Sequence, residues 1–335
     1  MTESLPPVDI DALPAEVAAD DIFVESEIPA APLPYESPFH IQKHTWYGTD
    51  GSVWDLDDPD SGVFLVQEAI EGLHYPLTDD IERESPSIAG GSFHGYRVKP
   101  RDVIWALYVY TDESSEAFYD LDSRIWRSMR VGQYGTWRVT LPDGSFRELS
   151  MRQVPTAFSH ERDPGRFGWV KYPVRFKADV NPFWTYPYEV PGSKSTFDST
   201  EGDNFFGGES GAGPEFVISP TRAETTKEIY NDGDEPVNPV ITVKGPMDFV
   251  DFSIGNRNYH LECDLEFGEW LTINTKPREF SLSDSSGANR MKSIDNWVFE
   301  PLPIQATTKI TVFAQGLGGG SVMFDVSPLY HRAWG

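Results

Sequence analysis

The sequence predicts a mainly β protein with two domains: a β domain that contains one α-helix, and a separate antiparallel β-sandwich. Short apolar runs recur about ten residues apart in the C-terminal part of the chain, a spacing typical of sandwiches and barrels. A single segment has apolar residues at helical spacing. The 28 glycines and 27 prolines supply the turns that such a fold needs.

The most regular pattern runs from about Lys227 to His331. Turn residues at Gly245-Pro246, Gly255-Asn256 and Gly268 separate its apolar runs. These runs predict strands at residues 240–243, 249–254, 259–263, 270–273, 309–313 and 321–326, with a turn cluster at 231–234 and a glycine-rich turn at 316–320. No helical stripe competes with them, so we predict a compact antiparallel sandwich.

The N-terminal part is predicted to be a β domain. Turns at Asp50-Gly51 and Pro142–Ser145 predict two hairpins. Residues 101–110 are almost continuously apolar, which predicts a central strand buried on both faces. Further strands are expected at 62–66 and 170–176. Residues 88–93 are expected to form a tight passage before another strand, and residues 155–168 a polar loop.

One helix is predicted at Asp112–Arg130. Asp112 or Ser114 can cap its first turn, and the acidic residues come early and the arginines late, which complements the helix dipole. Its apolar residues recur every four positions, at Ala117, Leu121, Ile125 and Met129. Such a stripe predicts a helix packed on its own sheet.

Composition divides the chain into three segments. Residues 1–40 are rich in acids and proline and contain no Lys or Arg, which predicts an extended arm that becomes ordered only against neighbouring subunits. Residues 41–185 are expected to form the β domain, and residues 186–335 the sandwich. The latter range begins with a linker, residues 186–215, that is rich in Gly, Ser, Asp and Glu.

The chain is strongly acidic, with 53 acidic and 27 basic residues and a net charge of −26. Phosphate binding requires a basic face, so we expect no specific binding of nucleic acid. No apolar run reaches the roughly 18 residues of a membrane span, and no secretory signal is recognisable. The single cysteine, Cys263, lies in a strand pattern typical of a buried small hydrophobe.

Catalytic and metal-binding motifs are missing from the sequence. It has no nucleophile elbow, phosphate-binding loop or dinucleotide fingerprint. The acids Asp55 to Asp60 lack the spacing of a calcium loop and predict a solvated loop, and His40 and His44 lack the glutamate of a zinc-hydrolase helix. We therefore predict no enzyme, no cofactor and no metal.

Two groups of residues are candidates for contacts with other molecules. Arg257, Asn258, His260 and Trp270 combine an aromatic face with planar polar groups, which suits a glycan or a protein partner, although ordinary strand and turn positions explain them more simply. Lys171, Arg175 and Lys177 alternate with apolar residues along one strand. We assign this basic strand to a contact with another protein subunit.

Several motifs follow one another in an order that carries a family resemblance. They are Trp46–Leu56, Gly90–Ser92, Arg124–Trp126, Leu141–Leu149, Asp179–Trp184, Tyr230–Gly245, Gly268–Asn274 and Tyr330–Trp334. With these motifs the chain resembles the distal tail proteins of bacteriophages with long, non-contractile tails, often called minor tail proteins in phages of actinobacteria. The resemblance covers most of residues 44–335, and the acidic arm lies outside it.

The resemblance implies a β-barrel-like N-terminal domain that assembles into a hexameric ring and a galectin-like C-terminal sandwich that projects outward. Such a ring sits at the distal end of the tail, connects the tail tube to the baseplate hub and the receptor-binding machinery, and passes DNA through its channel. The implied partners are further copies of the chain, the tail tube protein and the tail hub protein, with the tape measure and receptor-binding proteins as further candidates. Assembly in the host cytoplasm is expected.

The resemblance supplies no catalytic or cofactor residues. An acidic wall suits a channel through which DNA slides without being held. The alternative function left open is a carbohydrate-binding module or adhesin that recognises a host cell-wall glycan.

Overall fold

The structure is a computed structural model, and it describes residues 42–66, 69–85, 88–160, 162–186, 194–198, 222–315 and 320–335. The acidic arm, most of the expected linker and residues 316–319 of the expected glycine-rich turn lie outside these residues. Residues 41–335 form one compact unit. Within it, two hydrophobic cores are built from different sheets.

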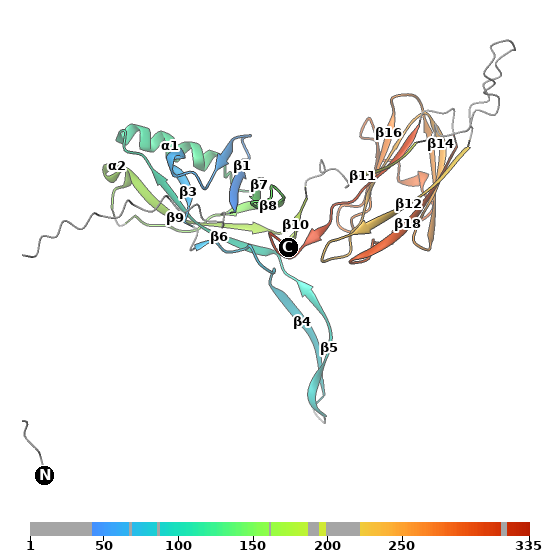
Figure 1. Cartoon of the computed structure of the whole chain (residues 1–335), viewed down its shortest axis with the longest axis horizontal. Coiled ribbons are helices and arrows are strands. Elements are labelled where there is room, and N and C mark those ends of the chain that lie inside the picture. The colour runs from blue at the N-terminus through green and yellow to red at the C-terminus, as the bar shows by residue number, and fades with distance from the viewer. Residues whose placement is uncertain are drawn as a thin grey trace, which may run out of the picture. The chain divides into compact units, whose positions relative to one another are not determined.

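The first core lies against a nine-stranded antiparallel sheet that closes almost into a barrel. The path β2-β1-β7-β8-β9-β6-β3 runs through most of it, and β10 pairs with both β8 and β20 (Figure 1). Its strands are β1 (Lys43–Tyr47), β2 (Val53–Asp55), β3 (Val63–Leu65), β6 (Arg101–Tyr110), β7 (Tyr134–Thr140), β8 (Phe146–Val154), β9 (Trp169–Ala178), β10 (Trp184–Thr185) and β20 (Leu329–Tyr330). Both predicted hairpins, β1–β2 and β7–β8, are confirmed.

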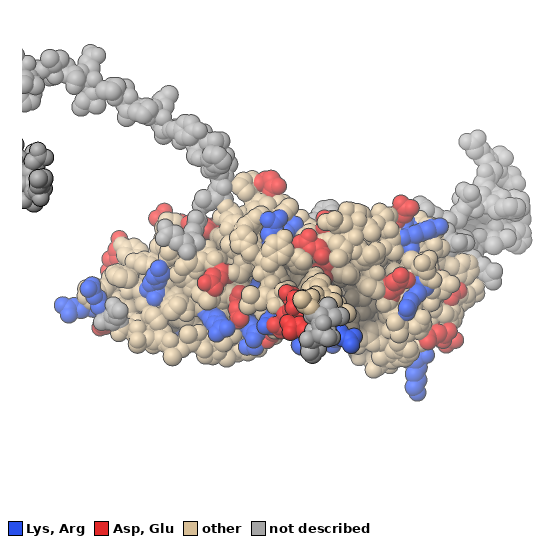
Figure 2. All heavy atoms as spheres, turned by 90° about the horizontal axis from the view of Figure 1, so that it is seen from below, with Lys and Arg blue, Asp and Glu red and all other residues tan. Residues whose placement is uncertain are grey.

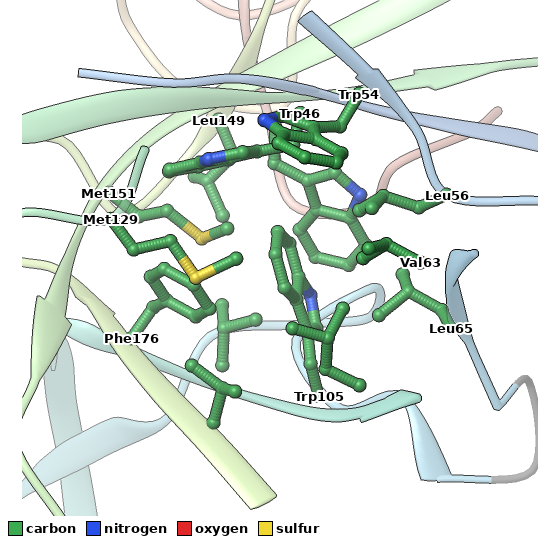
Figure 3. Close-up of a cluster of buried hydrophobic side chains, with 14 of the residues drawn as sticks. Trp46, Trp54, Leu56, Val63, Leu65, Trp105, Met129, Leu149, Met151 and Phe176 are labelled. Atoms are coloured by element: carbon green, nitrogen blue, oxygen red, sulfur yellow. The ribbon is translucent and has the colours of Figure 1, made fainter. Parts of the chain in front are cut away.

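Aromatic side chains fill this core because alternate residues of each strand point inward. Trp105 packs with its ring centroid 5.5 Å from that of Trp46 and 5.3 Å from that of Trp137. Figure 3 shows Trp46, Trp105 and Phe176 gathered together with the thioethers of Met129 and Met151. Strand β6, expected in the centre of the sheet, lies between β9 and the short edge strand β3.

The predicted helix is confirmed as α1 (Ser115–Arg127), which contributes Phe118 and Ile125 to the core. Ser114 is the residue that caps it: its hydroxyl accepts a hydrogen bond from the Ala117 N–H at 3.1 Å. A second, four-residue helix, α2 (Pro164–Phe167), occurs where the sequence predicted only a loop. Asp163 caps it and proline occupies its first position, so local chemistry explains this turn.

A hairpin that the sequence did not predict as a unit extends from the first domain as a separate two-stranded sheet (Figure 1). It consists of β4 (Thr78–Ser85) and β5 (Ile88–Val98). The sequence predicted a strand only after a tight passage at residues 88–93, whereas β5 already begins at Ile88. Register shifts interrupt its pairing at two places, and no further strand pairs with either of its edges among the described residues.

The second core lies between two antiparallel sheets, which confirms the predicted sandwich. One sheet has the order β11-β19-β13-β16-β17 and the other β12-β18-β14-β15. The strands are β11 (Lys194–Asp198), β12 (Arg222–Asn231), β13 (Val240–Lys244), β14 (Met247–Ile254), β15 (Arg257–Leu265), β16 (Trp270–Asn274), β17 (Ser281–Asp284), β18 (Ala306–Gln315) and β19 (Ser321–Asp325). Strand β11 lies inside the range expected to be a linker and pairs with β19.

The end of the chain returns to the first domain. Trp184 of β10 pairs with Tyr330 of β20, and both Tyr330 and Ala333 belong to the first core. The buried Arg101 donates a hydrogen bond to the carbonyl of His331 at 2.8 Å. The range 186–335 expected for the sandwich therefore includes a terminal segment that packs against the other domain.

Candidate functional site

Two exposed sheet faces carry most of the residues that the sequence selected. We call the exposed side of the first sheet around β9 the proximal face, and the exposed side of the sheet β12-β18-β14-β15 the distal face. Each strand presents one set of alternate side chains to its core and the other set to the exposed side.

The proximal face contains the basic strand. In β9, alternate residues from Val170 to Ala178 are buried, so Lys171, Arg175 and Lys177 share the opposite side, with Lys177 half-buried. Arg175 contacts the carboxylate of Asp102 at 3.0 Å. The pattern in the sequence therefore placed all three basic residues together.

Other charged residues of the proximal face are also paired within the face. Arg138 contacts Glu148 at 2.6 Å, and Arg152 contacts Asp179 at 2.6 Å. The phenol of Tyr134 donates a hydrogen bond to Asp179 as well, at 2.6 Å. Figure 2, a view from below Figure 1, shows Lys and Arg side chains interspersed with Asp and Glu over the part of the surface visible in that view.

The distal face arranges polar groups in rows across neighbouring strands. Asp251 of β14 lies opposite Phe313 of β18 on one side and His260 of β15 on the other. The next row places Ser253 between Thr311 and Asn258. These side chains line a shallow recess of about 430 Å³, together with Asp295 and Asn296 from the loop beside β15.

A hydrogen bond joins two titratable side chains, His260 and Asp251, in the middle of this recess. The Nδ1 atom of His260 lies 2.5 Å from the Asp251 carboxylate, and this contact raises the pKa of His260 above its usual value. The ring of Phe249 lies 5.5 Å from the His260 ring and holds it from the side. Because Nδ1 is engaged, the imidazole has only Nε2 left for an external partner.

Of the four residues proposed from the sequence for a glycan or partner contact, two line the recess and two do not. Asn258 and His260 both line the recess. Arg257 instead donates a hydrogen bond to the carbonyl of Val298 at 3.1 Å. Trp270 is exposed, but it belongs to β16 in the other sheet of the sandwich.

Asp251, Thr311 and Phe313 line the recess but were missed by sequence reasoning. Their alternation along β14 and β18 was visible as exposed positions. Only the register between strands, which brings Asp251 opposite both Phe313 and His260, assembles them into one site.

Nothing in the described ranges assembles a set of metal ligands. No group of three or more His, Cys, Asp or Glu residues there has suitable geometry. Burial raises the pKa of Cys263 to about 12, so its thiol stays protonated at neutral pH. No helix in the same part of the chain is both long and apolar enough to cross a membrane.

Comparison with known proteins shows similarity over most of the chain to a phage tail protein and to solved structures. The minor tail protein Gp27 of Mycobacterium phage D29 is 22% identical over 329 residues, which span 86% of this chain and 96% of Gp27. The crystal structure of SPP1 Dit, described as a paradigm of the hub adsorption apparatus in phages that infect Gram-positive bacteria, aligns with 87% of this chain and 99% of Dit, with a TM-score of 0.53 and 13% identity. No family model matches the chain.

The chain has the fold of a phage distal tail protein. The resemblance predicted from the ordered motifs is thereby confirmed, as is the mainly β fold. Both similar proteins are components of phage tails. The distal tail fold itself does not assign a role to either exposed face.

Proposed function

We propose that this chain is a structural protein of the virion that forms a hexameric ring at the distal end of a phage tail. The ring joins the tail tube to the baseplate hub and the receptor-binding machinery, and DNA passes through its channel. Alignment over 96% of a minor tail protein and 99% of Dit supports the proposal, because it includes both domains.

The β4–β5 hairpin is the observation that carries the assembly part of the proposal. Two strands without a third, or a packed surface, are at best marginally stable in water. This hairpin nevertheless exposes large apolar side chains, with Ile81 54% and Phe93 62% exposed. A neighbouring subunit that covers these side chains would stabilise the hairpin and gain apolar burial from it.

Native mass spectrometry of the full chain tests the proposal. We expect a hexamer for the unaltered protein and smaller species for the double variant Ile81→Asp, Phe93→Asp, because charges would then face the subunit contact. Glu84→Lys is the matched control: it changes the charge of an exposed residue of the same hairpin without removing an apolar contact.

One result would contradict the ring: an unaltered protein that remains monomeric and is absent from the tail tip in micrographs of virions. A double variant that assembles and enters tails normally would instead show that the hairpin takes no part in the subunit contact.

The basic strand is proposed as part of a contact with a subunit or with the tail tube. Lys171, Arg175 and Lys177 share the proximal face, and Arg175 is already paired with Asp102. With a net charge of −26, the chain should repel phosphates, so no mobility shift of DNA is expected even at low salt. Tight, salt-sensitive DNA binding would contradict both the open channel and this assignment.

A further inference from the structure

We propose that the recess of the distal face is a binding site for a neutral saccharide. Its polar contacts come from Asp251, Asn258, His260 and Thr311, and its apolar contact from Phe313. The inference concerns the sandwich alone. It is therefore independent of ring formation, and either proposal can fail without the other.

The recess presents hydrogen-bonding groups that the protein itself leaves unused. Neither Ser253 nor Asn258 has a side-chain hydrogen-bond partner within the described residues. Asp251 uses one carboxylate oxygen for His260, which leaves its second oxygen as an acceptor. The Asn258 amide offers both donors and an acceptor, as a hydroxyl-rich ligand requires.

The spacing of these groups follows from the sheet. Neighbouring strands lie about 4.8 Å apart, and residues on one face of a strand repeat about every 6.7 Å. Asp251, Ser253, Asn258 and His260 occupy four adjacent positions of this grid. Several ring substituents of one sugar can therefore be bound at once by side chains that the strands hold in place.

Apolar rings border the polar grid. Phe313 is half-buried beside Asp251, and its ring centroid lies 6.0 Å from that of Phe249. Together they offer an apolar surface for the C–H face of a pyranose. The recess volume of about 430 Å³ is within the range of roughly 300–1,000 Å³ for small-ligand sites.

The charge of the recess selects against anionic ligands. Asp251 and Asp295 both line it, and no Lys or Arg is among its lining residues. His260 is the only group there that can become cationic near neutral pH, and it is paired with Asp251. A polyanionic glycan would meet the carboxylates of Asp251 and Asp295 with no Lys or Arg beside them, whereas a neutral one would use them as hydrogen-bond acceptors.

The same composition makes the recess a poor protein-docking site. The centres of protein interfaces are depleted in Asp and Ser and enriched in aromatic residues and Arg. Here polar groups occupy the centre, Ser253 and Asn258 among them without a side-chain partner in the described chain, and the aromatic rings lie at the border. Covering these groups with an apolar partner would leave them without hydrogen bonds, at a cost in free energy.

The test uses the full-length chain on an array of neutral, anionic and amine-bearing glycans, followed by calorimetric titration of the glycans it retains. We expect saturable binding to neutral glycans and none to anionic ones. Three results would overturn the proposal: no saturable binding to any neutral glycan on the array, a preference for anionic glycans, or retention of amine-bearing glycans alone.

Variants then place the site. Asn258→Ala and Phe313→Ala should each weaken binding roughly tenfold, because each removes one set of contacts. Glu228→Gln is the control, since Glu228 lies opposite Lys309 on the same sheet but does not line the recess. Thermal melting verifies that each variant is folded. If folded variants of the recess kept the affinity of the unaltered protein, the saccharide would bind elsewhere on the chain.

Discussion

The proximal and distal faces are both exposed sides of antiparallel sheets, yet they differ in whether their polar side chains have partners within the face. On the proximal face Arg138, Arg152 and Arg175 each contact a carboxylate of the same face. On the distal face Ser253 and Asn258 have no side-chain partner in the described part of the chain. A face whose polar groups pair with one another has fewer left for a ligand, whereas the distal face can exchange bound water for one.

The difference extends below the surface of the first domain, where polar groups act as cross-links. Arg101 is almost fully buried and donates hydrogen bonds to the carbonyls of Pro182 at 2.6 Å, Gly72 at 2.7 Å and His331 at 2.8 Å, and also to that of His74. Burial lowers the pKa of its guanidinium to about 10, so the charge is retained at neutral pH. One side chain thus joins three separate segments.

The largest expected effect is therefore that of Arg101→Met. Methionine keeps the length of the side chain but leaves the carbonyls without their donor, so we expect a loss of about 3–5 kcal/mol in the free energy of unfolding. Urea unfolding followed by tryptophan fluorescence measures it. This signal reports mainly on the first domain, because the sandwich contains only Trp270 and Trp297 among the ten tryptophans.

Arg257→Met is the matched control for this substitution. Arg257 is exposed and donates to a single carbonyl, that of Val298, at 3.1 Å. Its replacement should change stability by less than about 0.5 kcal/mol. Equal losses for the two variants would show that the paired polar groups of the first domain are not structural cross-links.

Unlike Arg101, His44 is a buried polar side chain of the first domain that has no hydrogen-bond partner in the described chain. Its side chain is fully buried and stacks on Trp137, with ring centroids 5.6 Å apart. Neither ring nitrogen has a hydrogen-bond partner in the described chain. Burial lowers the pKa of His44 from 6.5 to about 4.

This pKa predicts a pH dependence of stability. Between pH 6.5 and 4 the unfolded chain binds a proton at His44 that the folded chain does not, so stability is lost as the pH falls. His44→Phe should remove about 2–3 kcal/mol of the loss between pH 7 and pH 4.5. Urea unfolding at both pH values measures the change.

Asp57 titrates in the opposite sense and provides the control. Burial raises its pKa from 3.8 to about 6, so the folded state binds the extra proton and this group gains stability as the pH falls. Asp57→Asn should therefore steepen the acid loss while His44→Phe reduces it. If both variants changed the pH dependence of stability in the same direction, the assignment of the opposite pKa shifts to His44 and Asp57 would be wrong.

Much of the fold could be predicted from the sequence because its signals are local. Alternation identified β9, glycine turns separated the strands of the sandwich, and a serine and an apolar stripe located α1. The β4–β5 hairpin escaped prediction because β4 consists mostly of charged and polar residues and so shows no apolar alternation. The return of Tyr330 to the first core depends on contacts distant in sequence.

The candidate site depends even more on distant contacts. Asn258 and His260 could be selected together because they are alternate positions of one strand and so share its outer side. Trp270 was grouped with them for its chemistry, but exposure alone does not reveal which sheet a strand joins. Thr311 and Phe313 entered the recess only through the pairing of β14 with β18, which no local pattern encodes.

The smallest expected effects compare one cross-strand pair from each face. Arg138 and Glu148 are directly opposite on β7 and β8 and form an ion pair, whereas Ser253 and Asn258 are directly opposite on β14 and β15 without a side-chain contact. A double-mutant cycle with Arg138→Met and Glu148→Gln should give a coupling of about 0.2–1 kcal/mol. The cycle with Ser253→Ala and Asn258→Ala should give none within error.

The pair Ser253 and Asn258 also separates an effect on ligand binding from an effect on the free energy of unfolding. Replacing either residue removes a group that already faces water, so each single variant should stay within about 0.5 kcal/mol of the unaltered protein. The same Asn258→Ala variant is expected to lose saccharide affinity, and that combination is the signature of a ligand group. Chemical denaturation of the four proteins of each cycle measures the couplings. A distal coupling as large as the proximal one would mean that the polar groups of the recess support the sheet, and the contrast between the faces would disappear.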